Sequence, residues 1–131
     1  MKRLLFVCVE NSCRSQIAEA FARRHGGEKV KSYSAGSRPS GKVNPRAIAS
    51  MREVGYDLTA HVSKSLGEIP DLEYDAVITM GCGDVCPFVR GKIHEEWSIP
   101  DPKLLPPERF REVRDRIEAK VKALFHRIGI D

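Results

Sequence analysis

Cys8 and Arg14, two side chains with complementary chemistry, stand six residues apart in the stretch CVENSCRS. A cysteine thiolate is a strong nucleophile, and the planar guanidinium of an arginine can hold two oxygens of a tetrahedral oxyanion. Asn11 could brace the loop between them, and the Ser15 hydroxyl could hydrogen-bond the sulfur of Cys8. The stretch therefore supplies a nucleophile and an anion clamp. The residues expected to bind the anion are Asn11, Ser12, Cys13, Arg14 and Ser15.

The elements on either side of this stretch would place it at a helix N-terminus. Residues 4–7 (LLFV) form a continuous apolar run that is typical of a strand buried on both faces of a parallel sheet. Residues 15–27 (SQIAEAFARRHGG) have apolar side chains at helical spacing, basic residues near the end and a closing glycine. A loop between such a strand and such a helix offers backbone N–H groups and the positive end of the helix dipole to an anion.

The rest of the chain alternates strands with helices. Strands are expected at residues 30–36, 74–80 and 94–99, and a helix should begin at Pro45 with Asn44 as its N-cap and run toward Gly55. A final amphipathic helix should begin at Pro107. This order predicts an α/β fold in which a four-stranded parallel sheet is flanked by helices, with residues 1–131 as a single domain.

Two further stretches with reactive side chains also follow predicted strands. Residues 81–87 (GCGDVCP) carry Cys82 and Cys86, and Asp101 lies in the PDP sequence after the last strand. In open α/β sheets, ligands bind beyond the carboxyl ends of the strands. We therefore expect these three stretches to meet at one edge of the sheet.

Composition limits the possible classes of function. Twenty-two basic and 18 acidic residues give a net charge of +4 without a long basic block, so we expect binding of small anions and not of nucleic acid. The N-terminal apolar run is too short for a secretory signal or a membrane span, and a cytoplasmic location is predicted. In that compartment the four cysteines should be reduced at rest.

The sequence VCVENSCRSQIAEAF, followed by YSAGS, resembles the low-molecular-weight protein tyrosine phosphatase superfamily over nearly the whole chain. Within that superfamily, NSCRSQ together with VITMGCGDVCP is more similar to the thioredoxin-coupled arsenate reductases. The Asp101–Pro102 pair matches the general-acid motif of the family.

The resemblance implies a mechanism. Cys8 would attack arsenate while Asp101 protonates the departing oxygen. Cys82 would then attack the sulfur of Cys8 and release arsenite, and Cys86 would attack Cys82 to leave a disulfide for thioredoxin. It implies no cofactor and no metal. Lys64 stands where some relatives carry an aspartate that helps to bind potassium near Asn11, Glu19 and Ser34, so its ammonium could replace that ion.

Two alternatives remain open. The same Cys8, Arg14 and Asp101 could hydrolyse phosphotyrosine or an aryl phosphate through a phosphocysteine, although Lys103 then stands where the phosphatases place tyrosines. The four cysteines Cys8, Cys13, Cys82 and Cys86 could instead hold zinc, with wider spacing than structural zinc sites favour. Outside these groups, we expect Cys13 to fill space under the loop, and His25, His61, His94 and His126 to be surface or boundary residues.

Overall fold

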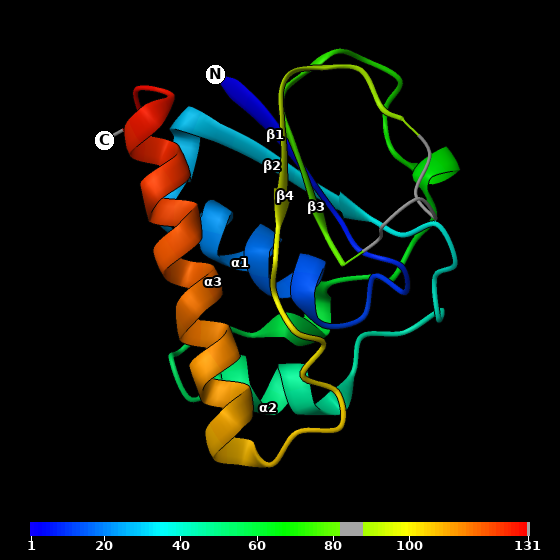
Figure 1. The fold of residues 1–131 in the computed structure, drawn as a ribbon, viewed down its shortest axis with the longest axis vertical. Helices are drawn as coiled ribbons and strands as arrows, with labels where there is room; N and C mark the ends of the chain where they lie inside the picture. The colour runs from blue at the N-terminus through cyan, green and yellow to red at the C-terminus, as the bar shows by residue number, and fades with distance from the viewer. Residues whose placement is uncertain (82–87, 131) are drawn as a thin grey trace.

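The computed structural model of the chain describes residues 1–81 and 88–130. Within them, four strands form one parallel sheet in the order β2-β1-β3-β4 (Figure 1). Their bounds are β1 (Lys2–Val7), β2 (Val30–Ala35), β3 (Tyr74–Met80) and β4 (Gly91–Trp97). The predicted four-stranded parallel sheet of an α/β fold is confirmed.

The central position of β1 explains its unbroken apolar sequence. The strand pairs with β2 on one side and with β3 on the other, so its backbone groups are used on both edges. Successive side chains of a strand point to opposite faces. Leu4 and Phe6 join the larger core cluster and Leu5 and Val7 join a second one, and all four are buried.

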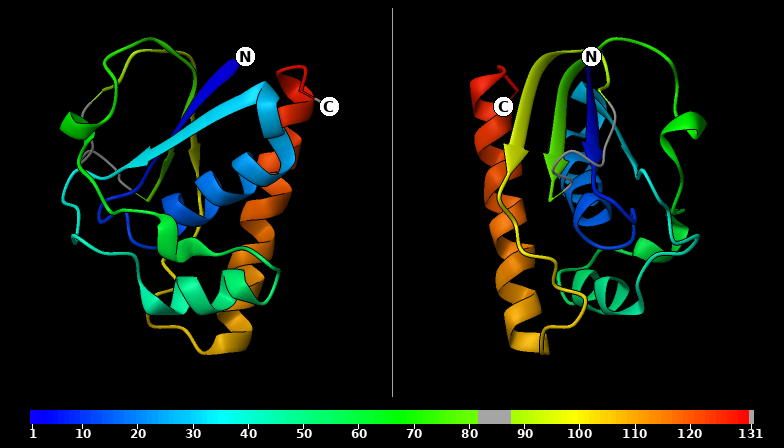
Figure 2. Two further views of the ribbon diagram at one scale, coloured as in Figure 1. Left: turned by 180° about the vertical axis from the view of Figure 1, so that it is seen from behind. Right: turned by 45° about the vertical axis from the view of Figure 1, so that its right-hand side comes forward.

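The helices lie together on one face of the sheet, over the larger core cluster (Figure 2). They are α1 (Arg14–Gly26), α2 (Pro45–Arg52) and α3 (Pro107–Arg127). Ile17 and Phe21 of α1 meet Ile117 and Val121 of α3 in this cluster, with all four buried. The helical periodicity of both segments therefore marked the faces that pack against each other.

The opposite face of the sheet is covered by chain without an α-helix. Leu66, Ile69 and Leu72 pack there against the second core cluster, in which Tyr74 and Val77 are buried. This covering segment includes one turn of 3₁₀ helix, η3 (Leu66–Glu68); the other such turns are η1 (Gly27–Lys29) and η2 (Leu58–Ala60). Among residues 1–81 and 88–130, the α-helices all lie on one side of the sheet.

Local sequence signals set most of the element ends. Asn44 caps α2, because its side chain accepts a hydrogen bond from the N–H of Arg46 at 2.8 Å and Pro45 follows at the first helical position. The last strand begins at Gly91, earlier than the predicted residue 94, because β4 is an edge strand and its side chains show no clear apolar alternation. Among residues 1–81 and 88–130, no helix is long and apolar enough to cross a membrane.

Candidate active site

The loop from Cys8 to Cys13 joins the carboxyl end of β1 to the N-terminus of α1, as predicted. The first turn of α1 holds no acidic side chain, so the positive end of its dipole remains available to an anion. Several loop carbonyls bond to neighbouring segments: those of Val9, Glu10 and Ser12 accept from the N–H groups of Arg38, Ser40 and Asn44. These carbonyl dipoles are therefore directed away from the loop interior, where an anion would bind.

The Cys8 sulfur lies 2.9 Å from the Ser15 hydroxyl, and both residues are buried. Asn11 donates from Nδ2 to the same hydroxyl oxygen at 2.7 Å. Because that bond uses the oxygen of Ser15 as acceptor, the hydroxyl proton is free to point at the sulfur. A hydrogen bond of this kind stabilises a thiolate more than a thiol. The predicted partnership of Ser15 with Cys8 is present in the structure.

Asn11 holds the loop in a conformation that few residues adopt. Its φ angle is +50°, in the left-handed region that asparagine tolerates better than most residues, and its side chain is fully buried. The side-chain oxygen accepts from the backbone N–H of Lys64 and from Nε2 of Gln16, both at 2.9 Å. The predicted bracing role thus includes contacts to a distant segment of the chain.

Arg14 reaches across the site to the chain that follows β4. Its Nη1 donates to the carbonyl of Ile99 at 3.0 Å, and its Nη2 lies 3.8 Å from Oδ2 of Asp101. Only 11% of the side chain is exposed, so the surrounding protein restricts the position of the guanidinium. A guanidinium fixed in this way is ready to bind an oxyanion through its remaining N–H donors.

A cavity of about 150 Å³ brings the predicted residues together. Asp101, more than 85 residues away in sequence, faces it across the same space as the loop, with 39% of its side chain exposed. The residues lining the cavity are Cys8, Val9, Glu10, Ser12, Cys13, Arg14 and Asp101. The expected convergence of the first and last of the three stretches is therefore found, with the Cys8 thiol, the Arg14 guanidinium and the Asp101 carboxyl group around one small space.

Cys13 is buried under the loop, and both Cys8 and Cys13 are free cysteines. Burial raises the pKa of the Cys13 thiol to about 12, and the nearby carboxylate of Asp101 contributes further to this rise. A thiol that stays protonated is a poor nucleophile. Cys13 therefore fills space at neutral pH, as its sequence context suggested.

Cys82 and Cys86 lie outside the residues that the structure describes. The last described residue before them is Gly81, which has a φ angle of +71° and packs against Arg14. No group of three or more His, Cys, Asp or Glu side chains in the described ranges is arranged to hold a metal ion.

Sequence reasoning missed a buried polar network behind the loop. His61, expected at the surface or boundary, has a side chain that is only 4% exposed. Its Nδ1 lies 3.0 Å from Oε1 of Gln16 and its Nε2 lies 2.7 Å from the hydroxyl of Tyr56. Burial lowers the pKa of His61, which favours the neutral ring. Gln16 in turn bonds Asn11, and no local sequence signal indicates this arrangement.

Lys64 lies beside the carboxylate of Glu19, as the sequence comparison suggested. Its ammonium is 4.0 Å from Oε1 of Glu19, whose side chain is 2% exposed and also accepts a hydrogen bond from Ser34. Burial lowers the pKa of Lys64 and the negative charge of Glu19 opposes that shift. The positive charge of the lysine is therefore directed at the buried carboxylate.

Comparisons with known proteins agree with this geometry. A glutaredoxin arsenate reductase from Synechocystis is 40% identical over 98% of this chain and all of its own. A solved arsenate reductase in a phosphate-binding state superposes with a TM-score of 0.89 at 40% identity, over 98% of this chain and 100% of that one. A thioredoxin-dependent arsenate reductase from Corynebacterium glutamicum gives 0.78 at 32% identity, over 98% of this chain and 62% of its own.

The family assignment covers almost every residue. Residues 3–131 match the low molecular weight phosphotyrosine protein phosphatase family. The chain belongs to the low molecular weight phosphotyrosine protein phosphatase family.

Proposed function

We propose that this protein reduces arsenate to arsenite through a covalent intermediate on Cys8. The observation that carries the proposal is the small cavity in which Cys8, Arg14 and Asp101 meet, with the Ser15 hydroxyl beside the sulfur. Relatives that are 40% identical and share this fold are named arsenate reductases. The site has the size and charge that a tetrahedral oxyanion needs.

In the first step the Cys8 thiolate attacks arsenic and forms a sulfur–arsenic bond. The bond from arsenic to one hydroxyl group of arsenate breaks, and that hydroxyl takes a proton from the Asp101 carboxylic acid and leaves as water. Arg14 and the positive end of α1 hold the remaining oxygens in place. Arsenic is still in its +5 state at this stage, because no electrons have been transferred.

The reduction itself is assigned to a cysteine relay. The Cys82 thiolate attacks the sulfur of Cys8, a disulfide forms, and the electron pair of the sulfur–arsenic bond stays with arsenic, which leaves as arsenite. Cys86 then attacks Cys82, frees Cys8 as a thiolate and leaves a Cys82–Cys86 disulfide. These two roles rest on the sequence and the family resemblance, since both residues lie outside the described ranges.

Thioredoxin is the proposed reductant of the final disulfide, and a glutaredoxin is the alternative. One similar structure is a thioredoxin-dependent enzyme, whereas a more similar curated relative is named for glutaredoxin. Both reductants deliver two electrons by thiol–disulfide exchange. A turnover assay with each system in parallel distinguishes them.

A second activity uses the same residues. The matched family is defined by phosphatases, and Cys8, Arg14 and Asp101 could hydrolyse an aryl phosphate through a phosphocysteine. In that reaction Cys82 and Cys86 have no role. Hydrolysis of para-nitrophenyl phosphate that survives in a Cys82→Ser, Cys86→Ser double variant would support this second activity.

The test of the relay is peptide mapping after a single pulse of arsenate. Wild-type protein should show Cys82 linked to Cys86, the Cys86→Ser variant should show Cys8 linked to Cys82, and Cys8→Ser should form no disulfide. The last variant is inactive because a serine hydroxyl does not ionise near neutral pH. Arsenite release with all cysteines still free would refute the relay, and absence of arsenate turnover with either reductant would refute the proposed function.

The role of Asp101 has its own test. Asp101→Asn removes the transferable proton but keeps the shape of the side chain, so the first covalent step should slow by about 10²-fold or more. Phosphate binding, measured by calorimetry, should weaken little or improve because a negative charge has left the cavity. An unchanged rate of adduct formation would remove Asp101 from this role.

A further inference from the structure

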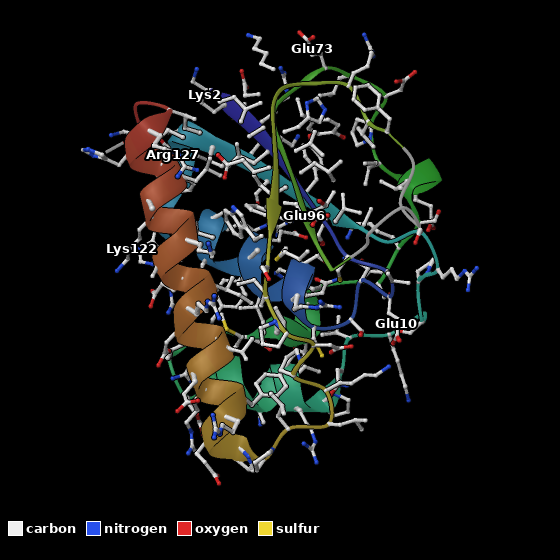
Figure 3. The ribbon with its side chains drawn as sticks, in the orientation of Figure 1. Lys2, Glu10, Glu73, Glu96, Lys122 and Arg127 are labelled. Atoms are coloured by element: carbon white, nitrogen blue, oxygen red, sulfur yellow. The ribbon has the colours of Figure 1, made fainter. Side chains whose placement is uncertain are left out.

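An ion pair between Glu10 and Lys103 connects two loops of the site. The ammonium of Lys103 lies 2.7 Å from Oε2 of Glu10, although the two residues are 93 positions apart. Glu10 belongs to the loop between β1 and α1, where Figure 3 labels it. Lys103 belongs to the segment between β4 and α3 that also carries Asp101. Neither side chain has been used in the mechanism so far.

Glu10 and Asp101 line the cavity, and Lys103 is bonded to both of them. We call these three residues the rim of the cavity. The backbone N–H of Lys103 donates to Oδ1 of Asp101 at 3.1 Å, so Lys103 is anchored next to the proton donor. Glu10 first, and then Asp101, raises the pKa of Lys103, which places its ammonium among the acidic groups of the rim.

The direction of nucleophilic attack determines which part of a substrate would face this rim. The nucleophile attacks from the side opposite to the departing oxygen, and that oxygen leaves toward the proton donor. With Cys8 as the nucleophile, the departing group of any substrate therefore points toward Asp101. Whatever is attached to that oxygen would extend past Asp101, whose neighbour Lys103 is paired with Glu10 of the facing loop.

Resting on the proposed function, we infer that the Glu10–Lys103 ion pair determines the substrate class, admitting bare tetrahedral oxyanions and opposing esters with an aryl group. The departing oxygen of arsenate carries only a proton and fits within a cavity of about 150 Å³. The ring of an aryl phosphate would extend through the rim. It would have to separate the two charges or cover them with an apolar surface, and both are unfavourable.

The size of the effect follows from exposure. The side chains of Lys103 and Glu10 are 38% and 41% exposed, so the pair is partly solvated. Partly exposed ion pairs contribute modestly to free energy, which sets the expected discrimination against the ring at about fivefold. The pair therefore biases the site toward inorganic oxyanions without closing it.

The experiment compares two ligands that share a phosphoryl group and differ in the ring. Inorganic phosphate and phenyl phosphate are titrated calorimetrically into the reduced protein, and the ratio of their dissociation constants is determined. The variants are Lys103→Met, Glu10→Gln and the double variant. Lys92→Met is the matched control, because Lys92 forms an ion pair with Asp75 at 3.5 Å and neither residue lines the cavity.

Each single variant should improve the binding of phenyl phosphate relative to phosphate by about fivefold, since either change breaks the pair. The double variant should gain no more than a single one, because the two side chains act as a unit. Lys92→Met should keep the wild-type ratio. A ratio that is unchanged, or that rises in only one single variant, overturns the inference.

This measurement is independent of the proposed function. A change of net charge affects both phosphate ligands alike, so its effect largely cancels in the ratio. Lack of arsenate turnover in the wild-type protein would refute arsenate reduction. The ratio of dissociation constants would still show whether the ion pair opposes an aryl group, in that case in a phosphatase. Normal arsenate turnover with an unaltered ratio in the variants would refute only the role of Glu10 and Lys103.

Discussion

Gly81 lies directly against the guanidinium of Arg14: a Cβ atom at Gly81 would overlap Nη1 of the arginine. The residue that follows β3 therefore helps to position the Arg14 side chain. The absence of a side chain at Gly81 leaves room for Arg14, at a φ angle of +71° that favours glycine.

Gly81→Ala should displace Arg14 and weaken phosphate binding by about tenfold or more, because a bidentate contact depends on the position of the guanidinium. Calorimetry of phosphate binding measures this loss. Gly55→Ala is the matched control: its φ angle is +81°, but a Cβ there would meet only ordinary contact, at 3.7 Å from Arg24. Both variants should lose about 1 kcal/mol of stability, because an alanine is strained at a positive φ angle. Equal phosphate affinity in the two variants would contradict the role given to Gly81.

Asn11 makes two separable contributions, one through its backbone and one through its side chain. Asn11→Gly permits the φ angle of +50° but removes the bonds to Ser15, Gln16 and Lys64, whereas Asn11→Ala also introduces backbone strain. Alkylation of Cys8 by iodoacetamide, followed by mass spectrometry at pH 7, should slow about tenfold in both variants. Thermal unfolding should show Asn11→Ala to be the less stable of the two. Normal alkylation in Asn11→Gly would show that the side-chain bonds do not activate the nucleophile.

Cys13 should make the protein sensitive to alkaline pH. Its pKa in the folded state, about 12, is raised above the model-compound value of 9.0, so the unfolded chain loses its proton first. The contribution of this thiol to stability is therefore complete below pH 9 and declines as the pH rises from about 9 to about 12. Urea unfolding of wild type and Cys13→Ala at several pH values measures the difference. If the stability difference between the two proteins stays constant across this range, the thiol is not protonated in the folded state as described.

The ammonium of Lys64 should make a bound potassium ion unnecessary. Ions that bind only the folded state raise stability by mass action. Wild-type protein should therefore unfold at the same temperature in potassium and sodium buffers of equal ionic strength. Lys64→Met removes one positive charge beside Glu19, leaves the ion pair of Glu19 with Arg23 at 2.5 Å, and should be less stable in sodium. A potassium-specific gain in the wild-type protein would refute the replacement, and a gain confined to the variant would support it.

The parts of the fold that were predictable carry local signals. The apolar run of β1, the Asn44–Pro45 start of α2 and the periodicity of α3 each identify an element from neighbouring residues. The start of β4 was missed because an edge strand with exposed side chains lacks such a pattern. The covering of the other sheet face by residues 66–72 was also not predictable, since that segment has little regular structure.

In the candidate site, too, the residues with a local sequence signal were predictable and the long-range contacts were not. Cys8, Arg14 and Ser15 were identifiable because a strand, a loop and a helix start follow one another within a short stretch. The ion pair of Glu10 with Lys103 and the burial of His61 depend on contacts between segments that are far apart in the chain. Such contacts arise from the order of strands in the sheet, which sequence periodicity does not specify.

The central position of β1 also determines when the loop from Cys8 to Cys13 can take up its structure during synthesis. Leu4 pairs with Ala76, so one edge of β1 has no partner until the chain has been made through β3. The carbonyl of Ile99, which fixes Arg14, is made later still. Contacts of such large sequence separation delay folding. Although Cys8 is translated long before Ile99, the nascent chain acquires a complete anion site only after the segment that follows β4 has been made.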